Sequence, residues 1–131
     1  MGVALLDTSI VIAALNRDDA LHHAVSRAVR AERDRHALAI SALTYAEILV
    51  GPLRAGAQSV EVVERFAAQV RIIDLSPRIA RLAAELRAAR GLKLPDAVIV
   101  ATGRQAEAAV ILTADARWRG VETVRVVGGG R

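Results

Sequence analysis

Short unbroken apolar runs alternate along this chain with longer stretches in which apolar residues recur at helical spacing. The first run, residues 3–6, has an apolar side chain at every position. Such a run is typical of a strand that is buried on both faces of a parallel sheet. Unbroken apolar runs predict strands at 3–6, 37–40 and 109–112, and the interrupted apolar stretches 70–75 and 123–127 are also predicted as strands.

The stretches between these runs predict helices, since their apolar residues lie three and four positions apart. Ser41 supplies an N-cap for one helix, and Ser76-Pro77 starts another by placing proline at its first position. Gly51-Pro52 predicts a break or bend, followed by a turn at 56–59. The predicted helices cover 9–15, 20–35, 42 to about 50, 60–69, 77–90 and 94 to about 107.

Strands that alternate with helices imply an α/β fold in which helices cover both faces of a parallel sheet. We expect a three-layer α/β/α domain with a central parallel sheet of four to five strands. The 131 residues show no linker, repeat or internal boundary, so 1–131 is expected to be a single domain. The glycines near the end predict a flexible tail at 128–131.

Composition narrows the chemistry. Apolar residues make up 53% of the chain, yet no apolar run is long enough to span a membrane, and no signal peptide is recognisable. The lack of cysteine excludes disulfides, thiolate metal sites and cysteine nucleophiles, and it fits a cytoplasmic protein. His22, His23 and His36 have no second histidine cluster to join, which makes a zinc site improbable.

The net charge is +4, and every basic residue except Lys93 is arginine. Arginine forms two parallel hydrogen bonds with phosphate, so a polyanionic partner would fit this composition. A genome rich in G and C would also enrich arginine together with alanine. The charge alone therefore leaves nucleic-acid binding open.

Four acids are placed by the pattern where they can meet. Asp7 ends the first predicted strand, and Asp115 follows the fourth through Thr113-Ala114. Ligands of open α/β sheets bind just beyond the carboxyl ends of the strands. Glu47 and Asp96 share helix faces with apolar residues, so their carboxylates are expected to point inward. If the two strands are neighbours, all four acids converge in one crevice.

Each acid also has an ordinary explanation. Asp7 could cap a helix, Asp96 could complement a helix dipole, Asp115 could form a turn, and Glu47 could reach solvent. Together these explanations are less economical, because nothing in the fold requires three aspartates at one sheet edge. Converging carboxylates repel one another, and a hard divalent cation such as Mg²⁺ or Mn²⁺ relieves this. Such an ion binds a scissile phosphate and activates water.

In these residues the chain resembles the PIN-domain ribonucleases, and specifically the VapC-type toxins of type II toxin–antitoxin systems. The resemblance covers almost the whole chain and rests on the order and spacing of four motifs. The motifs are Leu6-Asp7-Thr8-Ser9, Tyr45-Ala46-Glu47-Ile48, Leu94-Pro95-Asp96-Ala97 and Leu112-Thr113-Ala114-Asp115.

The resemblance implies a hydrolase that cleaves RNA endonucleolytically with Mg²⁺ or Mn²⁺, leaving a 5′-phosphate and a 3′-hydroxyl. It makes Asp7 and Asp96 the main metal ligands, with Asp115 completing the metal site. Glu47 would bind a second ion or position the attacking water. The hydroxyls of Thr8, Ser9 and Thr113 would orient carboxylates or water.

The resemblance also implies partners. A VapB-type antitoxin would bind near the acids and insert a basic side chain among them, and family members are commonly homodimers. Arg90 and Lys93 flank the loop before Asp96 and would be candidate RNA contacts, although ordinary surface charge is an equal explanation.

The chain departs from the family's pattern at one place. Many relatives carry a further acid shortly after the position of Asp115, whereas Ala116-Arg117-Trp118 stands here. This departure puts a full second metal site in doubt but leaves the first intact. Trp118 is expected to pack in the core.

A different class of function is a catalytically inactive PIN-like module that binds RNA or protein. The four acids argue against it, because a site that has lost catalysis should lose its ligands first. A receiver-like phospho-acceptor domain would need an acid pair beside the first strand and a lysine after a late one. A haloacid-type phosphatase would need an acid in place of Ser9.

Overall fold

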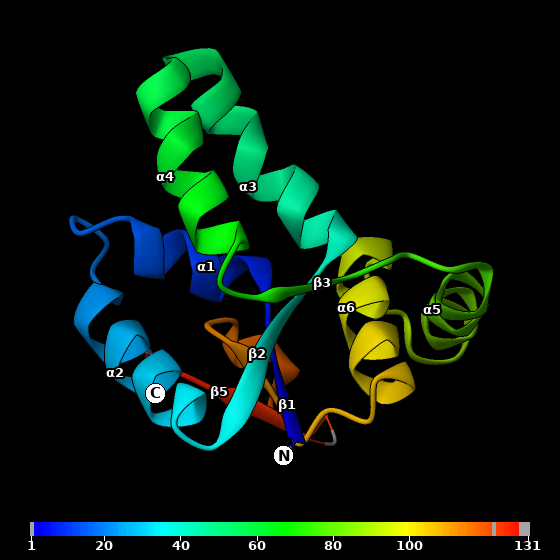
Figure 1. Cartoon of the computed structure of the whole chain (residues 1–131). Coiled ribbons are helices and arrows are strands. Elements are labelled where there is room, and N and C mark those ends of the chain that lie inside the picture. The colour runs from blue at the N-terminus through cyan, green and yellow to red at the C-terminus, as the bar shows by residue number, and fades with distance from the viewer. Residues whose placement is uncertain (1, 122, 129–131) are drawn as a thin grey trace.

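The computed structural model describes residues 2–121 and 123–128. At its centre lies a sheet of five parallel strands in the order β3-β2-β1-β4-β5 (Figure 1). The strands are β1 Gly2–Leu6, β2 His36–Ser41, β3 Arg71–Ile73, β4 Val110–Thr113 and β5 Val124–Val126. The three-layer α/β/α fold with a parallel sheet, as in PIN domains, is therefore confirmed.

Six helices and one short 3₁₀ helix connect the strands that the structure describes. The helices are α1 Thr8–Leu15, α2 His22–Arg33, α3 Ala42–Ala55, α4 Ala57–Ala67, α5 Pro77–Arg90, α6 Leu94–Gln105 and the 3₁₀ helix η1 Ala116–Trp118. Among the residues described, no helix is both long enough and apolar enough to cross a membrane.

The alternation of side chains along β1 explains the two layers of helices. Val3 and Leu5 face a cluster formed with α5 and α6, whereas Ala4 and Leu6 face a cluster formed with α1 and α2. Both faces of the strand are thus covered, which is why its sequence is apolar at every position. Trp118 is buried in the first of these clusters, as expected.

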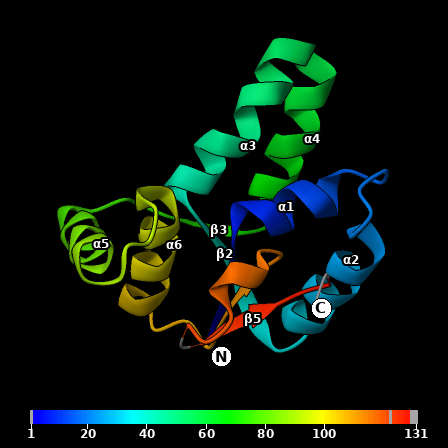
Figure 2. The same cartoon turned by 180° about the vertical axis from the view of Figure 1, so that it is seen from behind.

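Helices α3 and α4 form a hairpin that projects away from the sheet (Figures 1 and 2). The predicted break at Gly51-Pro52 is wrong, because α3 continues through both residues to Ala55. Pro52 lies inside α3, where its missing N–H leaves the carbonyl of Ile48 without its helical donor. The chain turns instead at Gly56, whose φ of 135° suits glycine alone, and α4 begins at once at Ala57.

Other boundaries differ by a few residues. The strand expected at 70–75 is only Arg71–Ile73, and the helix expected from 20 begins at His22. The 3₁₀ helix at Ala116–Trp118 has no periodic signal in three residues and was not predicted. Of the expected tail at 128–131, residues 129–131 lie outside the described residues.

Candidate active site

The four predicted acids line one cavity at the carboxyl edge of the sheet. Its volume is about 280 Å³. The acids reach it from four different elements: the end of β1, the third helix, the first turn of α6 and the segment beyond β4. The cavity is lined by Asp7, Thr8, Ser9, Ile12, Glu47, Pro95, Asp96, Ile99 and Asp115.

The pairing of β1 with β4 explains why residues about a hundred positions apart meet. Leu6 lies beside Leu112 in the sheet, and the backbone N–H of Asp7 donates to the Leu112 carbonyl at 2.9 Å. Both strands run in the same direction, so Asp7 and Thr113 leave the sheet side by side. Asp115 follows two residues later at the same edge.

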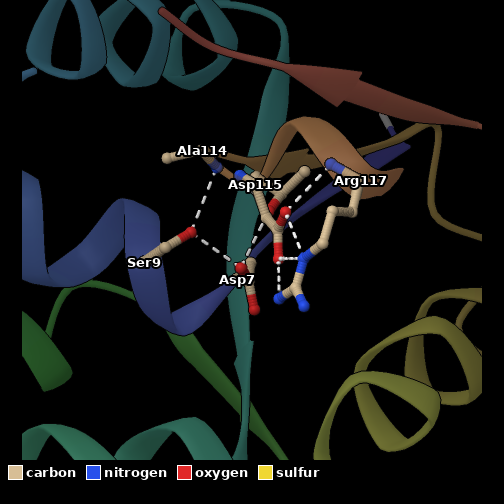
Figure 3. A network of polar contacts seen from close by, with 6 residues as sticks. Asp7, Ser9, Ala114, Asp115 and Arg117 are labelled. Atoms are coloured by element: carbon tan, nitrogen blue, oxygen red, sulfur yellow. Dashed lines mark hydrogen bonds and ion pairs between the residues drawn. The ribbon is translucent and has the colours of Figure 1, made fainter. Parts of the chain in front are cut away.

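Asp7 is buried and is held by two hydroxyl groups (Figure 3). Ser9 Oγ donates to its Oδ2 at 2.7 Å and Thr113 Oγ1 donates to the same atom at 2.9 Å. Ser9 and Thr113 are themselves fixed, since they accept the backbone N–H groups of Ala114 and Asp115. Within the described chain, no hydrogen bond reaches the other oxygen, Oδ1, of Asp7.

Asp7 occupies the N-cap position of α1, yet its side chain makes no capping hydrogen bond. The ordinary explanation of this aspartate as a helix cap is therefore wrong. A carboxylate that is buried, fixed through one oxygen and unpaired at the other is costly unless something binds the free oxygen.

Glu47 lies on the exposed side of α3, and the expectation that it points into an apolar face is wrong. Its neighbours Ala46 and Val50 are exposed as well, because α3 projects beyond the sheet and only its other side packs. The carboxylate nevertheless lines the cavity, where Thr8 Oγ1 donates to Oε1 at 2.6 Å. Thr44 supports this arrangement through a 2.9 Å contact between its hydroxyl and that of Thr8.

Asp96 is half-buried in the first turn of α6, and no described residue donates a hydrogen bond to its carboxylate. Burial raises the pKa of Asp96, and the nearby charges of Asp7 and Asp115 raise it further. Arg117 and Lys93 oppose this effect. The ionised form of Asp96 is therefore disfavoured by its surroundings as they stand.

Asp115 has the opposite environment. Arg117 donates from Nε to both carboxylate oxygens at 3.0 Å and from Nη2 to Oδ2 at 2.5 Å (Figure 3). The backbone N–H of Arg117 donates to Oδ1 as well, so Asp115 also caps η1. The hydrogen bond from the Arg117 side chain is the main reason that the pKa of Asp115 is lowered.

These residues fit a hard divalent cation. Asp7 Oδ1 and the Asp96 carboxylate line one cavity as oxygen ligands that no described donor reaches, and the charge of Asp7 acts on Asp96. In the described ranges no three of the acids and histidines already form a group close enough to hold an ion. Thr8 and Arg117 hold the carboxylates of Glu47 and Asp115.

The opposite pKa shifts predict opposite effects on stability. In metal-free protein at pH 7, Asp96→Asn should raise the unfolding temperature, because ionised Asp96 is a cost to the fold above its raised pKa. Asp115→Asn should lower the unfolding temperature. The pKa of Asp115 is lowered in the fold, so ionised Asp115 stabilises the folded state at any pH above the usual pKa of an aspartate.

Thermal unfolding in EDTA measures both variants against the wild type. Each difference should shrink as the pH falls through the folded-state pKa of the residue concerned, since the wild-type carboxyl group then becomes neutral too. Shifts of the same sign for the two variants at pH 7 would contradict this electrostatic picture.

Two cations lie beside the acids. Lys93 and Arg117 line a second cavity of about 220 Å³, and Asp96 lies on the walls of both cavities. Arg90 is exposed in the last turn of α5 and lines neither cavity.

From the sequence, only the absence of an acid at 116–118 was noted, and the pairing of Arg117 with Asp115 was not predicted. The arginine two residues after Asp115 was the signal that could have predicted this ion pair.

Comparison with known families agrees with this geometry. Residues 4–123 match the family model of the PIN domain, and the chain belongs to that family. The resemblance inferred from the four motifs is thereby confirmed. No curated protein matches the chain.

Solved structures similar to this chain include toxin–antitoxin proteins. A toxin–antitoxin complex from Klebsiella pneumoniae is 28% identical, with a TM-score of 0.80 over 94% of this chain and 96% of that chain. VapBC2 from Rickettsia felis, bound to a DNA fragment from its promoter, is 19% identical with a TM-score of 0.78, over 95% and 98%. VapC20 of Mycobacterium tuberculosis, a Sarcin-Ricin loop cleaving toxin, is 19% identical with a TM-score of 0.69, over 82% and 86%.

The two structures at 19% identity establish likeness of fold alone. PIN domains of VapC toxins are typically nucleases, and PIN nucleases generally use divalent metal ions.

Proposed function

We propose that this PIN domain is a metal-dependent endoribonuclease that hydrolyses RNA phosphodiesters and acts as the toxin of a toxin–antitoxin pair. The observation that carries the proposal is the pair formed by Asp7 and Asp96. Both carboxylates line one cavity, no described donor reaches Asp7 Oδ1 or Asp96, and the charge of Asp7 raises the pKa of Asp96. A divalent cation between them would bind the oxygens that lack donors and would offset the repulsion between the two negative charges.

Asp7 and Asp96 would hold the ion, with Asp115 beside them completing its surroundings. A bound Mg²⁺ or Mn²⁺ would supply positive charge for the scissile phosphate and lower the pKa of a water molecule. Ser9 and Thr113 keep Asp7 in one orientation, and Thr8 does the same for Glu47. Glu47 Oε2 accepts no hydrogen bond from a described residue, so it can take the proton of the attacking water. The products are a 5′-phosphate and a 3′-hydroxyl.

Purified protein incubated with a structured RNA tests the enzymatic part of the proposal. We expect cleavage with Mg²⁺ or Mn²⁺ and none in EDTA, with 5′-phosphate ends on the products. Cleavage that persists in EDTA would contradict the metal-dependent reaction. Retention of RNA binding without any cleavage would favour the inactive binding module instead.

Thr113→Val is expected to lower metal affinity or the cleavage rate by about 10- to 100-fold, because it removes the hydroxyl that orients Asp7. The matched control is Thr102→Val. Thr102 is equally buried, but its hydroxyl bonds the carbonyl of Val98 within α6. Mn²⁺ affinity and cleavage should change in Thr113→Val only. Equal losses in both variants would show that Thr113 acts through stability rather than through Asp7.

The toxin role is supported by similarity to the Klebsiella pneumoniae toxin–antitoxin complex and by the fold shared with VapBC structures. The partner would be a VapB-type antitoxin that binds near the acids. Induction of the gene in a host without the antitoxin is expected to stop growth, and co-expression of the adjacent antitoxin gene should restore it. Normal growth at high expression would contradict the toxin role.

Exposed apolar side chains support a protein partner. Val50 and Leu53 on α3 and Val62 on α4 are 50%, 67% and 50% exposed. Association through this hairpin would remove them from water. We include a homodimer in the proposal on the basis of the family resemblance. Light scattering of the purified chain should give twice the 13.9 kDa mass of one chain, and a monomer at micromolar concentration would contradict the dimer.

A further inference from the structure

Arg117 lines the cavity next to that of the four acids and forms an ion pair with Asp115. It lies two residues beyond Asp115 on η1, and its guanidinium covers both oxygens of that carboxylate (Figure 3). The backbone N–H of Arg117 adds a further bond to Oδ1 at 2.9 Å. Asp115 is the one acid of the cavity that forms an ion pair within the described residues.

The other three acids form no ion pair with a described residue. Hydroxyl groups hold Asp7 and Glu47, and no described donor meets Asp96. The charge of Arg117 also reaches Asp96, because it favours the ionised form of that carboxyl group. Among the described residues, a direct ion pair therefore exists at Asp115, whereas Asp7 and Asp96 have none.

A second metal ion at Asp115 would meet two obstacles. It would have to displace a guanidinium that donates to both carboxylate oxygens, and it would add positive charge beside Arg117. An ion between Asp7 and Asp96 would displace no guanidinium, because neither carboxylate forms an ion pair within the described residues.

The guanidinium of Arg117 has N–H groups that its bonds to Asp115 do not use. An arginine side chain carries five N–H groups. The bonds to Asp115 use the single N–H on Nε and one on Nη2, and no described residue accepts from the two on Nη1 or the second on Nη2. The Arg117 side chain is 69% exposed, and it shares the neighbouring cavity with Lys93. The free N–H groups can therefore bind a phosphate while the carboxylate stays covered.

We propose that Arg117 takes the place of a second metal ion. It neutralises Asp115, limits the cavity to one ion held by Asp7 and Asp96, and offers its remaining N–H groups to a phosphate of the RNA. This inference rests on the proposed function and narrows its ligand set from three aspartates to two. Arg117 acts as a positioning residue toward Asp115 and as a binding residue toward the substrate.

Titration with Mn²⁺ in the absence of RNA tests whether Arg117 limits the cavity to one metal ion. Calorimetry is expected to show one Mn²⁺ per wild-type chain and two per Arg117→Ala chain, since Asp115 is then uncovered. Combining Asp115→Asn with Arg117→Ala should return the count to one. The matched control is Arg104→Ala, which removes an exposed arginine from the last turn of α6 and should keep one ion.

The result that overturns the inference is two ions in the wild type, or one ion with unchanged affinity in Arg117→Ala. In both cases the proposed nuclease would still stand, because Mn²⁺ binds. If the wild-type chain binds no Mn²⁺, both the inference and the metal-dependent function fail.

Binding of a fluorescent single-stranded RNA in EDTA tests the second part, because no metal or cleavage enters. The slope of log affinity against log salt should shrink by about 0.7 in Arg117→Ala, the value for one lost phosphate contact. Arg104→Ala should leave the slope unchanged. An unaltered slope in Arg117→Ala, or equal losses in both variants, would overturn the phosphate contact.

Discussion

Asp7→Asn and Asp96→Asn are each expected to lower the rate of metal-dependent RNA cleavage by about 1000-fold. Each substitution replaces a charged oxygen ligand by a neutral amide, so the ion and the charge it supplies to the phosphate are lost. Metal ions contribute several kcal/mol of transition-state stabilisation, and each ~1.4 kcal/mol is a factor of ten in rate.

Cleavage of one labelled RNA by wild type and variants, at equal protein and saturating Mg²⁺, measures this loss. The matched control is Asp18→Asn, which makes the same exchange at an exposed turn that does not line the cavity. It should cleave at the wild-type rate. Equal cleavage by wild type, Asp7→Asn and Asp96→Asn would point to a contaminating nuclease and would sink the assignment.

Arg125→Ala is expected to destabilise the fold by about 3 kcal/mol. Arg125 on β5 pairs with Glu32 on α2 at 3.2 Å, and the Glu32 side chain is only 3% exposed. Oε1 of Glu32 already lacks a hydrogen-bond partner within the described residues. Removal of the arginine leaves a buried carboxylate without its nearest cation, and breaking a buried pair costs about 3–5 kcal/mol. The low end applies because Arg125 is 48% exposed.

Urea denaturation of metal-free protein measures this change. The matched control is Arg81→Ala, which removes an arginine from the exposed pair with Glu85 on α5 and should cost at most about 0.5 kcal/mol. Replacing Glu32 and Arg125 together by leucine should recover most of the loss, since no charge is then left buried. A loss in the double variant as large as in Arg125→Ala would show that packing, rather than the charge, is responsible.

Local sequence was sufficient for the elements with strong signals. The run at 3–6 predicted β1 because a strand buried on both faces must be apolar throughout, and Ser76-Pro77 marked the start of α5. The proline at position 52 predicted a break that does not occur, since α3 continues to Ala55. The short 3₁₀ helix had no periodicity to detect.

Two of the four candidate acids were predicted because they follow apolar runs, and the other two because they share helix faces with apolar residues. Asp7 and Asp115 both stand just after strands, and the structure places them in one cavity with Glu47 and Asp96. The orientation of Glu47 could not be predicted, because the apolar neighbours on its side of α3 suggested a buried face. That face is exposed because the α3–α4 hairpin leaves the sheet.

The sequence by itself determined the order of strands and helices, the acids available at strand ends, and the family to which the chain belongs. Only the tertiary structure decided which strands are neighbours, and therefore that Asp7 meets Thr113 across β1 and β4. It also decided that no described donor reaches Asp7 Oδ1 or Asp96, while Arg117 covers Asp115. The physical reason is that hydrophobic periodicity reports burial along one element, whereas the pairing of a carboxylate depends on groups that distant elements bring within hydrogen-bond distance.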